Sequence, residues 1–199
     1  MHKRIAETPR MSGRVRALSM PIGLVPLTIP YSASHCGHSI NHGFFDTKGR
    51  PDLVARIPEA SGWPELAGLL RVLNSAHGDY RSLGCDVGFL PHRDGEAAGM
   101  KTKVASTIEI AYADPALNAD PSRFARLMER YAKFEAGPTA AEASWSRPTL
   151  LRTCYRSEGI RGWCVSLGVV GIGRDRDSAK ATWAAELARL EAFAAARSL

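Results

Sequence analysis

Three histidines and one cysteine occur within eight residues, in the segment 35–42 (HCGHSINH). Imidazole and thiolate groups are ligands that Zn²⁺ prefers, and four of them around one ion make a structural site. A glycine in the segment allows such ligands to converge. The spacing matches no established zinc signature, and a polar surface loop with ordinary hydrogen bonds is the alternative. His35, His38 and His42, together with Cys36, are the residues that a zinc ion would use, and Cys85 or His92 could take the place of Cys36.

A row of basic residues occupies one side of a predicted helix in the middle of the chain. Arg123, Arg126, Arg130 and Lys133 follow one another at i, i+3, i+7 and i+10, which places them on neighbouring turns. Such a row can contact successive phosphates of a nucleic acid or the carboxylates of a protein. The alternative is a solvated helix face without a ligand.

Two further basic pairs could extend such a surface. Arg14 and Arg16 belong to the N-terminal arm, and Arg174 and Arg176 follow the glycine-rich stretch 168–173. That stretch leads from a strand into a helix but has neither the glycine order nor the lysine of a phosphate-binding loop. The glycines therefore indicate a bulge or close packing rather than a nucleotide site.

The last quarter of the chain resembles the end of a double-stranded-RNA-binding domain. In that family a strand pair leads into a basic, alanine-rich helix, and here Arg174, Arg176 and Lys180 precede Ala184-Ala185. The resemblance implies RNA binding by this helix. The paired lysines of the family are absent and one long strand stands where the family has two, so membership is not inferred.

Composition sets limits on the class of protein. The chain has 199 residues, 45% of them hydrophobic, and a formal net charge of +6, which suits one globular domain with an affinity for polyanions. Its four cysteines are widely spaced, so a disulfide-framed secreted module is not indicated. Cys154 and Cys164 are expected to face each other in a hairpin as small buried residues. No apolar run reaches the length of a membrane span. We expect a cytoplasmic protein without membrane contact.

The chain must position these residues with a small set of elements. Extended structure is expected over 13–30, followed by a long irregular connection over 31–62 that carries the histidines. Apolar periodicity predicts helices over 63–77 and 178–197 and one beginning at Pro121, with Asp120 as its cap. Strands are predicted over 80–91 and 101–113, and a hairpin over 148–156 and 162–173.

The predicted fold class is α+β, an antiparallel sheet with helices on one face. The order β-α-β-β-α-β is that of a ferredoxin-like sandwich, here with an extra C-terminal strand and helix. A helix-strand-strand unit occurs twice, over 63–113 and 121–173. We expect a flexible basic tail over 1–12 and a single domain over 13–199.

Three functional hypotheses follow. The first is a non-catalytic binding protein whose arginine-rich surface engages nucleic acid, RNA in particular, or an acidic protein partner. The second is a zinc-dependent enzyme or zinc-stabilised module centred on residues 35–42, where Asp86, Asp94 or Glu109 would pair with a histidine in general acid–base work. The third is a protein inhibitor or adaptor of the kind that mobile elements encode. Because recognised catalytic motifs are lacking, the first hypothesis requires no cofactor and no catalytic residue.

Overall fold

The computed structural model describes residues 26–36, 39–91, 102–135 and 144–196. The predicted tail 1–12, Arg14, Arg16, His38, His92 and Asp94 lie outside these residues, so the structure says nothing about them. Within the described part of the chain, no helix is both long enough and apolar enough to cross a membrane.

The helices begin at prolines or at capping residues. Helix α1 spans Pro64–Leu73 and α2 spans Pro121–Glu135, each with proline in its first turn. The Asp120 carboxylate accepts a hydrogen bond from the Ser122 amide at 2.9 Å, which confirms the predicted cap of α2. Helix α3 spans Arg176–Ala195 and is capped by a reciprocal box between Asp175 and Ser178.

The segment predicted as an irregular connection over 31–62 is more ordered than expected. Its first part forms a small antiparallel hairpin of β2 (Ser34–Cys36) and β3 (Ser39–Asn41). Two short 3₁₀ helices follow, η1 at Pro51–Arg56 and η2 at Pro58–Ala60, each started by a proline. The prediction missed these elements because Ser, Gly and His are weak strand formers and a 3₁₀ turn leaves no periodic pattern. A further 3₁₀ helix, η3, spans Pro115–Ala119.

The main sheet of the described chain has five strands in the order β1-β6-β7-β5-β4. Their bounds are β1 Leu27–Ile29, β4 Tyr80–Pro91, β5 Thr102–Tyr112, β6 Ser144–Tyr155 and β7 Ile160–Gly173. The antiparallel sheet that the sequence predicted is wrong in one respect, because β1 pairs with β6 in parallel and the sheet is therefore mixed. The ferredoxin-like pairing is not confirmed either. That topology would place the first strand in the middle, but β1 is a three-residue edge strand and β7 occupies the centre.

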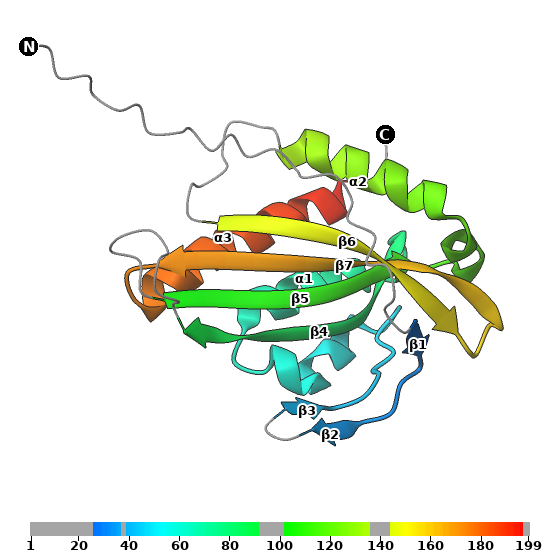
Figure 1. Cartoon of the computed structure of the whole chain (residues 1–199), viewed down its shortest axis with the longest axis horizontal. Helices are drawn as coiled ribbons and strands as arrows, with labels where there is room; N and C mark the ends of the chain where they lie inside the picture. Colours follow the sequence, from blue (N-terminus) through cyan, green and yellow to red (C-terminus); the bar gives the residue numbers. More distant parts are fainter. Residues whose placement is uncertain (1–25, 37–38, 92–101, 136–143, 197–199) are drawn as a thin grey trace, which may run out of the picture.

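The helix-strand-strand unit does occur twice, as α1-β4-β5 and α2-β6-β7. The two hairpins join through β5 and β7, which pair antiparallel from Thr102–Gly173 to Ile110–Val165. Figure 1 shows α1 and α3 packed behind the sheet and α2 lying along its β6 side. Side chains of all three helices and of one sheet face share a single core cluster, with Leu66, Phe124, Val169 and Trp183 among its fully buried members.

Helix α3 lies closest to the sheet because β7 presents glycine beneath it. A β-carbon added to Gly171 would lie 2.2 Å from the Trp183 nitrogen, and one added to Gly173 would lie 2.2 Å from the Ala179 nitrogen. No side chain fits into that space. The glycines therefore serve the close packing that their spacing indicated.

The opposite face of the sheet carries a smaller apolar cluster at one end only. Ile29, Leu83, Tyr155 and Cys164 pack there beneath the segment that contains β1. Beyond that cluster, polar residues occupy the middle of this face, namely Asp86, Thr107, Glu109, Thr149 and Ser166, and Trp145, Val170 and Ile172 lie towards the other end. We call it the open face, because the three α-helices pack their buried side chains against the other face.

The β6–β7 hairpin has a different register from the predicted one. Cys154 lies opposite Arg161 and Cys164 lies opposite Leu151, so the two cysteines are not partners. Since successive residues of a strand point to opposite faces, Cys164 joins the cluster beneath β1 whereas Cys154 belongs to the helix-covered face. Both thiols are free.

Candidate binding site on helix α2

Helix α2 has two distinct sides that meet along its length. Its apolar side is formed by Phe124, Leu127, Met128 and Tyr131, all buried against the sheet and α3. With about 100° per residue, Arg123 and Arg130 lie about 90–110° from the middle of the apolar side, whereas Arg126 and Lys133 lie about 150–170° from it. Arg123 and Arg130 therefore border the apolar side, and Arg126 and Lys133 continue the row onto the outer side of the helix. A ligand bound there would meet both kinds of surface.

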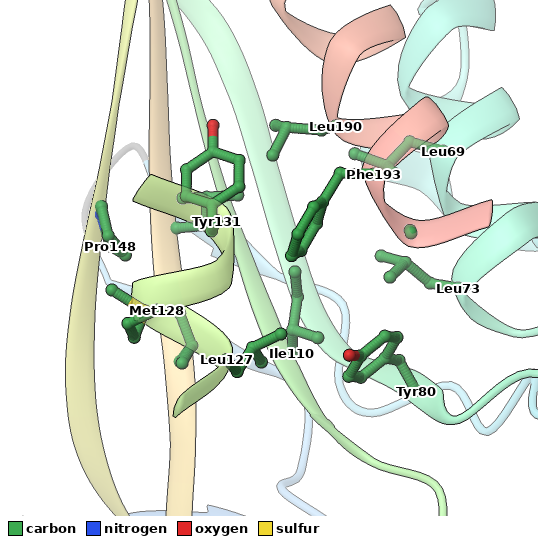
Figure 2. A pocket seen from close by; sticks show the side chains of 13 residues that line it. Leu69, Leu73, Tyr80, Ile110, Leu127, Met128, Tyr131, Pro148, Leu190 and Phe193 are labelled. Carbon is green, nitrogen blue, oxygen red and sulfur yellow. The ribbon is translucent and has the colours of Figure 1, made fainter. Parts of the chain in front are cut away.

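An apolar hollow of about 40 Å³ lies between α2 and the rest of the core. Figure 2 shows Leu127, Met128 and Tyr131 of α2 on one side and Leu190 and Phe193 of α3 on the other. The sheet forms the floor and α1 contributes further side chains. The remaining lining residues are Leu69, Leu73, Tyr80, Ile110, Pro148, Val165, Leu167 and Ala194. The hollow opens to the surface and is not a sealed void.

Arg130 lies at the edge of this hollow. Its guanidinium carbon stands 5.8 Å from the centre of the Phe193 ring, a cation–π geometry. The same side chain hydrogen-bonds to Tyr80; burial raises the pKa of Tyr80, and Arg130 lessens that rise. Phe193 and Tyr80 both line the hollow, so Arg130 reaches from α2 to the opposite wall.

The two arginines towards the start of α2 have weak local partners. Arg123 Nε lies 3.9 Å from Asp120 Oδ2 with both side chains almost half exposed, an ion pair worth little free energy. Arg126 Nη1 donates to the Ser122 hydroxyl at 3.2 Å. Their positive charges therefore remain available to an acidic ligand.

A pair of tyrosines connects the arginine row to the sheet. The rings of Tyr80 and Tyr112 stand 5.6 Å apart, and the Tyr112 hydroxyl donates to the Arg123 carbonyl at 3.1 Å. Burial raises the pKa of Tyr112, whereas Arg123, Arg130 and Arg126 lower it. All three arginines are therefore close enough to act on one hydroxyl, so their fields combine at this place.

The structure does not bring all the predicted basic residues together. Arg174 and Arg176 follow Gly173, which pairs with Thr102 at one end of β5, whereas the tyrosine pair lies at the other end. Ten residues of strand separate these ends, about 33 Å. Arg176 instead lies 4.8 Å from the centre of the Phe89 ring. Lys133 is exposed on the last turns of α2.

The predicted zinc ligands lie on and beside the small hairpin. His35 stands on β2 opposite Ile40, Cys36 ends that strand, and His42 follows β3. His35 and His42 are exposed. Among the residues that the structure describes, no three His, Cys, Asp or Glu side chains gather as a metal site would require. Because His38 is outside those residues, a zinc ion held by this hairpin stays a prediction.

The open face also carries a cluster of polar residues around Glu109. Its carboxylate accepts a hydrogen bond from Ser166 at 3.4 Å, and a β-carbon on Gly84 would stand 2.9 Å from Glu109 Oε2 and 2.7 Å from the Tyr31 hydroxyl. Burial raises the pKa of Glu109, and nearby Asp86 adds to the effect. The contacts described for Glu109 do not include the histidine that general acid–base chemistry would need.

Glu109→Gln is expected to raise the melting temperature at pH 7.5 and to leave it unchanged near pH 3.5. The folded-state pKa of Glu109 lies above its unfolded value, so the folded protein holds this proton more tightly. Its stabilising effect is present below the unfolded pKa and is lost as pH rises through the folded pKa. The wild type therefore carries the full cost of a buried charge at neutral pH, and glutamine removes it. Thermal unfolding of both proteins across this pH range measures the difference; a gain that is equal at every pH would contradict the assignment.

The sequence identified the arginine row but not the surfaces beside it. Tyr80, Tyr112 and Phe193 belong to three different elements and carry no motif. Only one signal was present, the placement of arginines directly beside the apolar positions of α2.

Comparison with known proteins adds no assignment. The chain matches no protein-family model, no curated protein and no solved structure.

Proposed function

We propose that this is a non-catalytic binding protein that engages an acidic surface of a partner protein through the arginine row of α2. The observation that carries the proposal is that Arg130 contacts two residues of an apolar hollow, Phe193 and Tyr80, and continues a row with Arg123 and Arg126 on the same helix. Guanidinium groups match carboxylates with paired hydrogen bonds, and interface centres combine arginine with aromatic and aliphatic groups. A protein partner offers both carboxylates and apolar side chains.

Nucleic acid suits this border less well. A phosphate backbone would use the arginines but would leave the apolar hollow without a counterpart. Stacking of successive bases would require several exposed aromatic faces along the row; Tyr80 and Tyr131 are buried in the core, and Phe134, at the end of the row, is 38% exposed. Binding of RNA or DNA is therefore the alternative that the experiment must separate.

Arg126→Glu combined with Arg130→Glu is expected to weaken binding of an acidic peptide at least about tenfold, because each reversal replaces attraction with repulsion. The probe is a fluorescent 20-residue helical peptide rich in glutamate, and a single-stranded oligothymidylate of equal charge is the competitor. Fluorescence anisotropy at several salt concentrations gives both affinities.

Arg174→Glu combined with Arg176→Glu is the matched control, since it makes the same charge change at the far end of β5. It is expected to leave peptide binding almost unaltered. Tighter binding of the oligonucleotide than of the peptide would show that the ligand is nucleic acid and not an acidic protein. Absence of binding to either probe at low salt, or an equal loss in both double variants, would overturn the proposal.

A further inference from the structure

We infer that the hollow beside α2 receives one leucine- or valine-sized side chain of the acidic partner, while neighbouring carboxylates of that partner bind Arg123, Arg126 and Arg130. The inference rests on the proposed function and names the chemistry of the partner at the same site. The partner segment would carry several acidic residues around a single aliphatic one.

The wall of the hollow selects an apolar occupant. Nearly all of its surface consists of carbon atoms from leucine, valine, isoleucine and aromatic side chains. The hydroxyl of Tyr131 already has hydrogen bonds with Ser146 and Glu186. A stable water needs two to four polar partners, which this wall does not offer, so an apolar group can enter without displacing a well-bound water.

The size of the hollow restricts the occupant further. A volume of about 40 Å³ is larger than the roughly 10–15 Å³ that one water needs and much smaller than the engineered cavity of about 150 Å³ that binds benzene. The hollow therefore has room for the branched end of one aliphatic side chain. An aromatic ring or an acyl chain would have to push α2 away from the core.

Arg130 links the hollow to the charged row. Its guanidinium contacts Phe193 and Tyr80, two residues of the wall, from the α2 side. Beyond it, Phe134 is 38% exposed and its ring lies 5.4 Å from that of Phe193, which extends the apolar lip. A carboxylate bound to Arg130 would therefore lie beside the entering aliphatic group. Desolvation of the pair by that group would strengthen the ionic contact.

The spacing of the three arginines predicts how far apart the partner's carboxylates lie. Arg123 and Arg130 are seven residues apart on α2, an axial distance of about 10.5 Å. A partner helix with glutamates at i, i+4 and i+7 covers the same length. One aliphatic residue on the neighbouring side of that helix would face the hollow.

The experiment compares two helical probe peptides that differ at one residue. Both carry glutamate at i, i+4 and i+7, and the position beside them is leucine in one and alanine in the other. Leucine has three more side-chain carbons than alanine, and it is expected to bind about tenfold more tightly because the hollow would bury about two of them. A tryptophan version is expected to bind no better than the alanine version.

Filling the hollow is expected to abolish this preference. Ala194 lines the hollow, and Ala194→Leu would occupy it from α3. Ala125→Leu is the matched control, because Ala125 lies outside the lining and on the other side of α2. Thermal unfolding verifies that both variants fold. Val165→Ile provides a second, smaller filling of the hollow if Ala194→Leu does not fold.

The outcomes separate this inference from the proposed function. Peptides that bind through Arg126 and Arg130 with equal affinity for leucine and alanine would overturn the inference and leave the proposed function standing. A leucine preference that survives Ala194→Leu, or that Ala125→Leu removes equally, would also overturn it. Peptides that do not bind at low salt at all would overturn the proposed function itself.

Discussion

Gly171→Ala is expected to lower the free energy of unfolding by about 3 kcal/mol. The added methyl carbon would lie 2.2 Å from the Trp183 nitrogen and 2.5 Å from the Ala179 carbonyl oxygen. Both are backbone atoms of α3, so no side-chain rotation can relieve the overlap. Helix α3 would have to move away from β7 along its first turns. Urea denaturation followed by tryptophan fluorescence measures the loss.

Gly168→Ala is the control on the same strand. Its methyl group would point to the open face, where the nearest atom is the Arg147 carbonyl oxygen at 3.8 Å, an ordinary contact. Because alanine loses less backbone entropy on folding than glycine, this variant should be as stable as the wild type or slightly more stable. Equal losses in both variants would show that α3 does not depend on a glycine surface.

The glycines of β7 are among the features of the fold that local sequence patterns could predict. The 168–173 stretch indicated close packing, and the cap and periodicity of α2 placed its start at Pro121, because these signals lie within a few neighbouring residues. Strand pairing is different. The apolar residues of β7 mark it as a buried strand, but nothing local states that its second neighbour is β5 or that Leu27–Ile29 joins β6 in parallel. Such pairings follow from contacts between distant segments.

The candidate site divides in the same way. The arginine row could be predicted, since i, i+3 and i+7 spacing on a helix is a local property. The hollow beside it could not, because its lining comes from α1, α2, α3 and the strands β4 to β7. Tyr80 illustrates the difference. In the sequence it is the first residue of a strand, and only the fold brings it within hydrogen-bonding reach of Arg130.

Trp183→Ala is expected to lower the free energy of unfolding by about 4 kcal/mol, within the range observed for buried tryptophans. The side chain is fully buried, and its indole nitrogen donates to the Ser106 hydroxyl at 2.9 Å. Its ring meets the edge of Trp63 at a centroid distance of 5.2 Å. Alanine would leave a cavity in the middle of the core and a buried hydroxyl without its donor. Chemical denaturation of both proteins measures the difference.

Trp145→Ala is the control, because Trp145 is 48% exposed on β6 and its loss should cost under about 0.5 kcal/mol. Similar losses in the two variants would contradict the central place of Trp183.

The Trp183→Ala substitution is also expected to affect binding. Leu190, Phe193 and Ala194 follow Trp183 along α3 and form one wall of the hollow. Trp183 holds α3 against β5 and β7, so its loss should reduce the preference for a leucine-bearing peptide under conditions where the variant is still folded. The charge-dependent part of binding to the α2 arginines should remain.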